Sequence, residues 1–197
     1  MKVLSVLATS LAVLGLVSFE VAAQTKTKLV LGTEGAYKPW GYMEDGGKLV
    51  GFEIDMVNEL CKRMSVECEI VPNDFAGLVP ALTAGKFDAI FAGMNSTEKR
   101  REAISFSRPY ALDPTSFGLP KGNDLNKMPE AGKPVNLADE AEWGKVLEAM
   151  KPALKGKVIG VQGSTTLSQF LEENLADTVT VREYSTTQQH DLDLAAG

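Results

Sequence analysis

The sequence predicts an α/β protein of two lobes, each built on a mainly parallel sheet with flanking helices. Two observations carry this prediction. Short apolar runs of strand type alternate with amphipathic runs of helical type along most of the chain, a pattern that is typical of parallel sheets. Around residues 111–121, Pro and Gly interrupt the alternation. We therefore expect a first lobe at residues 24–112 and a second lobe at residues 113–197.

The first lobe is predicted to hold three strands and three helices. In its first helix apolar side chains recur at helical spacing and define one buried face. They are Ile54, Val57, Leu60, Cys61 and Met64. Gly85 gives the second helix a left-handed stop. The predicted strands are residues 28–32, 67–71 and 87–92, and the predicted helices are residues 54–64, 75–84 and 97–104.

The second lobe begins where Asp113-Pro114 and Leu119-Pro120 break the chain. Its predicted strands are residues 157–161 and 179–184, and its predicted helices are residues 138–150, 167–174 and 187–196. The chain ending at residues 193–197 resembles the helix ending at residues 81–85, which a strand follows. By this analogy we expect the gene product to continue beyond Gly197, and the C-terminal part of the fold to be missing.

The first 23 residues predict a secretory signal peptide. Lys2 precedes a nearly uncharged apolar run at residues 3–19, and Val21-Ala22-Ala23 places short side chains where signal peptidase cleaves. The alternative is a membrane anchor, for which the run is short because spanning a bilayer takes about 20 apolar residues. We expect export and cleavage after Ala23.

Charge and cysteine content narrow the function further. The net charge of −6 argues against nucleic-acid binding, which depends on neutralising phosphates. In an oxidising compartment the two cysteines, Cys61 and Cys68, are expected to form a disulfide. The alternative, two separate buried thiols, stays open. Two cysteines and one histidine give little support to a metal site, and no cofactor is expected.

Three segments at the carboxyl ends of predicted strands could bind a small ligand. Residues 32–40 combine Glu34 with Tyr37 and Trp40, which suits a cation, although a plain surface loop is the alternative. Residues 95–101 begin a helix with three cations, against the helix dipole. This placement suits a bound anion, and a solvated basic turn is the alternative.

The third segment, residues 160–166, joins a strand to a helix with small and hydroxyl side chains that could contact an anion. It lacks the Lys of the phosphate-binding pattern. We expect the three segments to face one cleft. No hydrolase constellation is present, and His190 is expected on the solvent face of the last helix.

Taken together, these motifs resemble the polar-amino-acid family of periplasmic solute-binding proteins of ABC importers. The resemblance lies in Gly51-Phe52-Glu53-Ile54-Asp55, Lys86-Phe87-Asp88-Ala89-Ile90, Thr97-Glu98-Lys99-Arg100, and the spacing of Cys61 and Cys68. It implies the periplasmic-binding-protein fold, with two lobes that are joined by a hinge and close over a ligand. It also implies a monomer in the periplasm that delivers its ligand to a membrane permease, is not an enzyme, and binds no nucleic acid.

The same resemblance assigns ligand contacts. Arg100 matches the arginine that binds the ligand α-carboxylate, and Glu34 matches the acidic position that reads a distal cation. Tyr37 and Phe75 match the aromatic pair around the ligand side chain. The remaining matches are Ala92, Gly93 and Asn95 at the α-carbon end, and Ser164, Thr165 and Thr166 in the carboxylate loop.

Some positions depart from the family pattern. The family often has Ser where Ala92, Gly93 and Asn95 stand. The insert at residues 122–156 and the stretch 161–166 look closest to the opine-binding branch, whose ligands resemble octopine or nopaline. The family residue that binds the ligand α-amino group would lie beyond Gly197.

The predicted function is therefore capture of a basic amino acid or an arginine-derived opine for import. One alternative is a periplasmic dehydratase or lyase on the same scaffold, with Glu34 as its acid or base. A second alternative is the ligand-sensing domain of a receptor.

Overall fold

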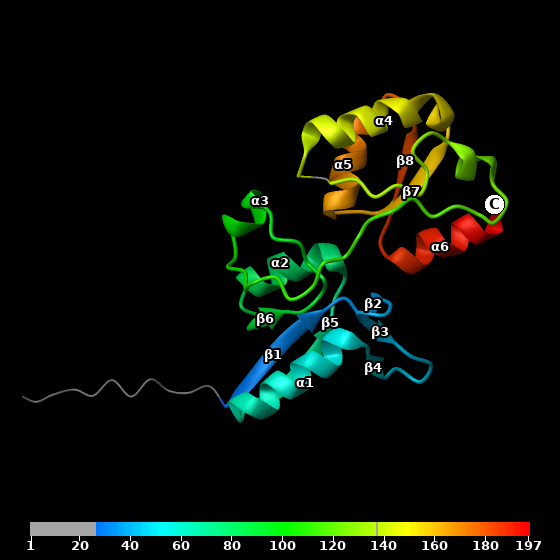
Figure 1. Cartoon of the computed structure of the whole chain (residues 1–197). Helices are drawn as coiled ribbons and strands as arrows, with labels where there is room; N and C mark the ends of the chain where they lie inside the picture. Colours follow the sequence, from blue (N-terminus) through cyan, green and yellow to red (C-terminus); the bar gives the residue numbers. More distant parts are fainter. Residues whose placement is uncertain (1–26, 137) are drawn as a thin grey trace, which may run out of the picture.

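The computed structural model describes residues 27–136 and 138–197 (Figure 1). The predicted signal peptide at residues 1–23 lies outside the described residues. The strands form two separate parallel sheets and one small antiparallel sheet. We call the part from β1 to α3 lobe 1 and the part from α4 to α6 lobe 2. The predicted α/β class with two lobes is confirmed.

Lobe 1 is centred on the strand β1 (Lys28–Thr33). It pairs in parallel with β5 (Glu67–Pro72) on one side and β6 (Ala89–Ile90) on the other. The strand predicted at residues 87–92 is thus much shorter. The Phe87 side chain is buried in the core beside Gly32. A Cβ added to Gly32 would lie 2.6 Å from the Phe87 ring.

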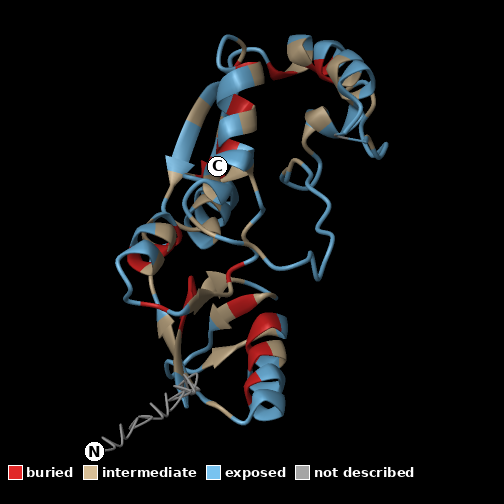
Figure 2. Cartoon of the chain, turned by 90° about the vertical axis from the view of Figure 1, so that its left-hand side faces the viewer, coloured by how far each residue is buried: buried red, intermediate tan, exposed pale blue. Residues whose placement is uncertain are grey.

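Two helices cover opposite faces of this sheet. The amphipathic helix α1 (Phe52–Met64) packs Val57 and Cys61 against Leu31, and Figure 2 shows buried residues on its sheet-facing side. On the other face, Leu78 of α2 (Phe75–Thr83) lies in a second cluster with Val30. Neighbouring residues of β1 therefore face different helices, as the two-residue period of a strand requires.

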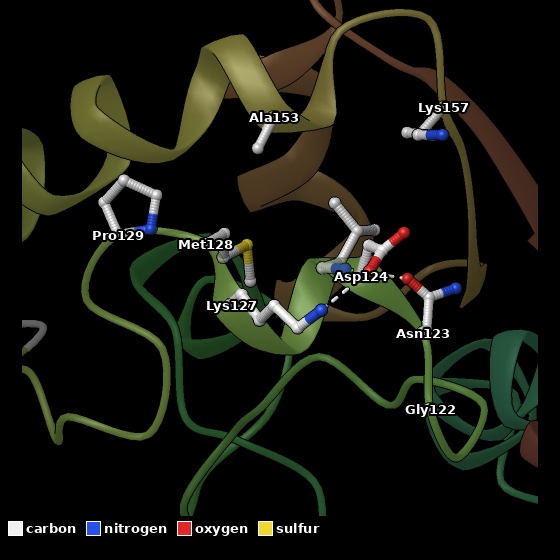
Figure 3. Close-up of a pocket in the computed structure, with 9 residues that line it drawn as sticks. Gly122, Asn123, Asp124, Lys127, Met128, Pro129, Ala153 and Lys157 are labelled. Atoms are coloured by element: carbon white, nitrogen blue, oxygen red, sulfur yellow. Dashed lines mark hydrogen bonds and ion pairs between the residues drawn. The ribbon is translucent and has the colours of Figure 1, made fainter.

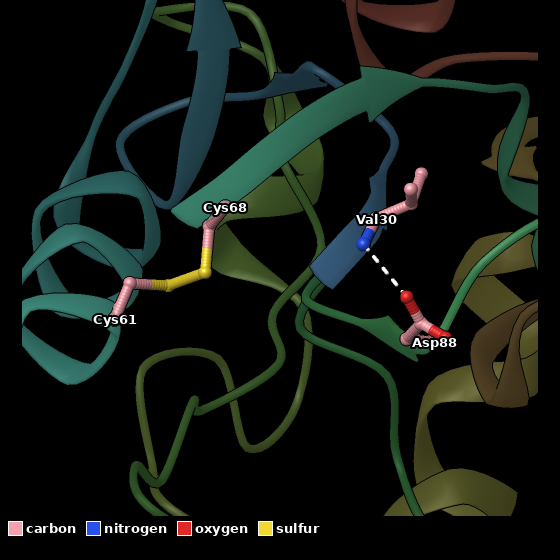
Figure 4. Close-up of a disulfide and its surroundings, with 4 residues drawn as sticks. All are labelled: Val30, Cys61, Cys68 and Asp88. Carbon is pink, nitrogen blue, oxygen red and sulfur yellow. Dashed lines mark hydrogen bonds between the residues drawn. A yellow bond between two sulfur atoms is a disulfide. The ribbon is translucent and has the colours of Figure 1, made fainter. Parts of the chain in front are cut away.

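The disulfide prediction is confirmed, and the alternative of two separate thiols is wrong. Cys61 of α1 and Cys68 of β5 are joined with an S–S distance of 1.99 Å and a Cα–Cα distance of 6.2 Å (Figure 4). Nearby, the Val30 backbone N–H donates to the Asp88 carboxylate at 2.8 Å, also drawn in Figure 4. The disulfide ties α1 to the edge strand of the lobe 1 sheet.

A small antiparallel sheet follows β1 and was not predicted. It consists of β2 (Ala36–Tyr37), β3 (Gly41–Met43) and β4 (Leu49–Val50), in that order. Strands of two or three residues are too short to show a period in the sequence. This sheet matters for the site because it fixes the position of Tyr37.

Lobe 2 is built on the parallel pair β7 (Val158–Gln162) and β8 (Thr180–Tyr184). The helices α4 (Glu140–Leu154) and α5 (Thr166–Leu175) pack into one core, where Leu147 and Leu154 contact Leu171 and Val161. The helix α6 (Thr187–Ala196) contacts β7 and, across the lobe boundary, β2.

Two local predictions are wrong. The helix predicted at residues 97–104 is the single turn α3 (Glu98–Arg101), which Thr97 caps. His190 is half-buried rather than on the solvent face, because its ring packs edge-on against Tyr184 of β8 with centroids 6.1 Å apart.

A long connection carries the chain from lobe 1 to lobe 2. Residues 104–120 hold no helix or strand, and a short turn of 3-10 helix, η1 (Asp124–Lys127), precedes α4 (Figure 1). The predicted lobe boundary at residues 112 and 113 falls in this connection and stays a prediction. Within residues 27–136 and 138–197, no helix is long and apolar enough to cross a membrane.

Candidate functional site

The candidate site lies where the carboxyl ends of the strands of both lobes meet. Glu34 follows β1, Asn95 lies a few residues beyond β6, and Ser164 follows β7. Side chains at these ends lie along the same edge of a parallel sheet, where ligands of such sheets usually bind. Hydrogen bonds between residues of the two lobes show that the predicted segments do meet.

Arg100 of α3 bridges the lobes. Its Nη1 donates to the Asn95 carbonyl oxygen at 2.7 Å, and its Nη2 donates to the Ser164 carbonyl oxygen at 3.0 Å. The guanidinium stands over the Phe75 ring, 5.6 Å from its centroid, in a cation–π arrangement. Burial lowers the pKa of Arg100, yet an arginine stays charged at any physiological pH. The site therefore holds a partly desolvated cation.

Asn95 and the loop after β7 form a second bridge. The Asn95 side-chain amide donates to the Thr166 hydroxyl at 3.0 Å. Ser164 adopts a left-handed backbone with φ 61°, and its carbonyl oxygen is the one that accepts from Arg100. The Thr165 hydroxyl is occupied locally, because it accepts from the Ser168 N–H and donates to the Gln162 carbonyl oxygen. Thr165 thus caps α5 and has no hydroxyl hydrogen left for a ligand.

Glu34 is a buried carboxylate held by lobe 2. The side-chain amide of Gln162 donates to Glu34 Oε1 and also contacts the Ser185 carbonyl oxygen at 3.1 Å. Burial raises the pKa of Glu34, the charge of Asp74 adds to this, and the hydrogen bond from Gln162 opposes it. A buried carboxylate with one side-chain donor is suited to pairing with a cation.

Gln162 lies in the predicted segment 160–166, but it was not named among the ligand contacts. It is the last residue of β7 and is buried, although glutamine is seldom buried in strands. Its two partners lie in different parts of the chain, and only the folded arrangement brings Glu34 close to it. A polar residue at the end of an apolar strand was the one available signal.

Tyr37 and Gly93 pack against each other on the lobe 1 side. Gly93 has φ 54°, and a Cβ added to it would lie 3.2 Å from Tyr37 Cε1. The Tyr37 hydroxyl donates to the Asp113 carboxylate at 2.7 Å. Burial raises the pKa of Tyr37, and the hydrogen bond to Asp113 raises it further. The phenol is therefore a neutral donor, fixed by the connection between the lobes.

Phe75 and Ala92 are placed differently from the other predicted contacts. Both belong to the hydrophobic cluster around Leu78 in lobe 1. The Phe75 ring faces the Arg100 guanidinium as well as this core, whereas only 6% of Ala92 is exposed. Phe75 therefore reaches the site through the face of its ring, and Ala92 belongs to the buried core of lobe 1.

A surface hollow of about 720 Å³ lies elsewhere, between the connection and lobe 2 (Figure 3). It is lined by η1, the end of α4 and Lys157, and Lys127 there pairs with Asp124 at 3.1 Å. None of the predicted ligand contacts lines it. Over the described ranges 27–136 and 138–197, no group of three or more His, Cys, Asp or Glu could hold a metal ion.

Comparison with known families and proteins gives a consistent picture. The family model described as bacterial extracellular solute-binding proteins, family 3, matches residues 29–191. The chain is 42% identical over 187 residues to the octopine-binding periplasmic protein of Rhizobium meliloti, covering 94% of this chain and 63% of that protein. It is 35% identical to the lysine/arginine/ornithine-binding periplasmic protein of Escherichia coli K12, covering 98% of this chain and 66% of that protein.

Solved structures with the same fold agree. An ancestral arginine-binding protein bound to arginine superposes with a TM-score of 0.71 at 34% identity, covering 87% of this chain and 67% of that one. An ancestral amino acid-binding protein, a precursor of cyclohexadienyl dehydratase, gives a TM-score of 0.67 at 28% identity, covering 87% and 66%. The chain thus spans about two thirds of the length of these relatives.

Proposed function

This chain belongs to the bacterial extracellular solute-binding proteins of family 3, and we propose that it captures a basic amino acid or an arginine-derived opine for import. Octopine and nopaline are examples of such opines. The names of its relatives, which bind octopine, or lysine, arginine and ornithine, support this ligand class.

One observation carries the proposal. A guanidinium, Arg100, and a carboxylate, Glu34, are both partly shielded from water at the junction of the lobes, and each contacts a residue of lobe 2. Opposite charges fixed in one site complement a ligand with a carboxylate at one end and a cation at the other. Arginine, ornithine and the arginine-derived opines all have this charge pattern.

We assign roles on this basis. Arg100 binds the α-carboxylate together with the loop of Ser164, Thr165 and Thr166, where Thr165 acts through its backbone. Glu34 binds the distal cation, and Gln162 orients it. Tyr37 and Phe75 enclose the ligand side chain, and the segment with Ala92, Gly93 and Asn95 meets its α-carbon end.

The cellular setting is part of the same proposal. The protein is exported through a signal peptide cleaved after Ala23, acts in the periplasm as a monomer, and passes its ligand to the permease of an ABC importer. Residues 24–112 form the first lobe and residues 113–197 the second, and the two lobes close over the ligand, since the contacts come from both sides.

Calorimetric titration of the protein expressed from its complete gene tests the ligand class. Arginine, ornithine, octopine and nopaline are titrated, with glutamine as the neutral comparison. We expect at least one of the four cationic ligands to bind more tightly than glutamine. Tighter binding of glutamine, or no binding of any of the five, would reject the proposed class.

A second candidate is an enzyme on this scaffold, since the raised pKa of Glu34 suits a general acid. The similarity to a dehydratase precursor concerns a protein that is itself described as amino acid-binding. Turnover of a bound ligand, followed by mass spectrometry of the titration mixture, separates this candidate from pure binding, which leaves the ligand unchanged.

A further inference from the structure

Glu53 is a buried carboxylate with no part in the ligand contacts proposed above. It lies in the first turn of α1, and only 1% of it is exposed. A carboxylate removed from water is costly unless hydrogen bonds satisfy it. Glu53 Oε1 accepts one from the Gly93 backbone N–H at 2.7 Å and another from the Tyr110 hydroxyl. The two donors belong to functionally different segments.

The first donor lies in the segment proposed to meet the ligand. Gly93 has the left-handed φ of 54° and packs against the Tyr37 ring. Because its N–H donates to Glu53, that N–H is not available to a ligand. Glu53 therefore determines which backbone groups near Gly93 remain free to contact the ligand.

The second donor lies in the connection between the lobes. Tyr110 follows α3, and its ring stacks on Phe52 with centroids 6.5 Å apart. Burial raises the pKa of Tyr110, and the hydrogen bond to Glu53 raises it further, so the phenol remains a donor at neutral pH. Three residues on, Asp113 accepts from Tyr37. The connection is thus fastened to lobe 1 at two points beside the site.

We propose that Glu53 is a positioning residue that couples the Gly93 segment to the connection between the lobes through one carboxylate oxygen. When the connection moves, the hydrogen bond from Tyr110 to Glu53 changes. The hydrogen bond from the Gly93 N–H to the same carboxylate oxygen then changes as well. The effect on ligand affinity rests on the proposed function. The coupling itself is a property of the ligand-free protein.

Hydrogen exchange in the ligand-free protein measures the coupling directly. Tyr110→Phe removes only a hydroxyl, yet we expect the Gly93 backbone N–H to exchange about tenfold faster, the size expected for a weakened hydrogen bond to a charged group. Glu53→Gln should have at least the same effect. Glu59→Gln is the matched control, because Glu59 is exposed on the same helix, where it pairs with Arg63, and it should change nothing.

Arginine or octopine affinity, measured by calorimetry on the same variants of the protein from its complete gene, gives the second readout. Tyr110→Phe should weaken binding about tenfold, as one such hydrogen bond allows, at temperatures where thermal melts show the variant fully folded. Glu53→Asp should also weaken binding although it keeps the charge, because the shorter side chain does not reach both donors.

Each outcome decides the proposal. Unchanged Gly93 exchange in Tyr110→Phe and Glu53→Gln overturns the coupling. Faster exchange with unchanged affinity makes Glu53 structural only and overturns its positioning role. If the wild-type protein binds neither ligand, the proposed function fails, while the exchange of Gly93 still confirms or refutes the coupling.

Discussion

The carboxylate of Glu34 offers a change that separates ligand recognition from folding. Glu34→Gln keeps the shape of the side chain and removes its charge. The carboxamide oxygen can still accept the hydrogen bond from Gln162. What the variant loses is the charge that we propose pairs with the distal cation of the ligand.

The size of the loss follows from the burial of this carboxylate. Only 9% of Glu34 is exposed, so a cation bound there is weakly screened, and a charge-assisted hydrogen bond contributes about 1.5–3 kcal/mol. Arginine and the opines should therefore bind about 10- to 100-fold more weakly. Glutamine has no distal charge and should lose little.

Whereas Glu34→Gln should weaken ligand binding, it should not lower the stability of the ligand-free protein. Because burial raises the pKa of Glu34 above its unfolded value, the ionised form is disfavoured in the folded state. The stability gained from protonation is present at low pH and is lost as pH rises through the raised pKa. Glu34→Gln does not ionise, so without ligand it should be at least as stable as wild type at pH 7. The difference should vanish below the ordinary glutamate pKa of about 4.3.

Calorimetric titration of arginine, octopine and glutamine, together with urea melts at pH 7 and at low pH, measures both effects. If Glu34→Gln weakened the binding of all three ligands equally, Glu34 would be structural and its proposed role in binding the distal cation would be refuted. Lower stability of Glu34→Gln at pH 7 would show that the ionised carboxylate is satisfied in the folded protein, against the pKa argument.

Three further predictions concern the rest of the fold and site. Arg100→Ala should abolish binding of every ligand, a loss of about 2–5 kcal/mol for a carboxylate left unpaired. Arg100→Lys should restore only part, since a point charge cannot form a fork of hydrogen bonds; full recovery in calorimetry would argue against carboxylate binding. Thr165→Ala removes the cap of α5 and should lower the unfolding free energy in urea melts by about 1 kcal/mol, and an unchanged midpoint would contradict the cap. Replacing both cysteines, whose sequence separation is 7, by Ser should lower it by about 2.5 kcal/mol in the chain-entropy model, and two alkylatable thiols in periplasmic wild-type protein would refute the disulfide.

Local pattern was enough to predict the regular elements of this fold. The apolar spacing around Val57 predicted α1 within two residues of its observed start, and the helix predicted at residues 187–196 has the observed bounds of α6. The helix α1 buries one face, so its period is visible in the chain itself. The helix α6 has no buried residue, and its agreement with the prediction does not rest on a buried face.

Elements set by distant contacts were not predictable in this way. The strand β6 is shortened because Phe87 fills the space above Gly32. The strands β2, β3 and β4 are too short for any period. The contact between Phe87 and Gly32 joins residues far apart in the sequence, whereas β2, β3 and β4 pair residues only four to eight positions apart and are hidden by their shortness alone.

The residues of the candidate site likewise fall into those that the sequence could indicate and those that only the folded structure shows. The resemblance to a known family supplied residues such as Arg100 and Glu34, and the structure does bring their segments together. Gln162 and Glu53 lie in quoted segments but were given no role of their own, because that role depends on partners 128 and 40 residues away. The capping role of Thr165 likewise became visible only in the folded loop.

A crystal structure of the protein from its complete gene, grown with arginine or octopine, tests the central claim most directly. We predict the ligand at the junction of the lobes, with its α-carboxylate on the Arg100 guanidinium and its distal cation on the Glu34 carboxylate. A ligand bound in the surface hollow beside Lys127, or one at the junction with its charged ends reversed, would contradict the account.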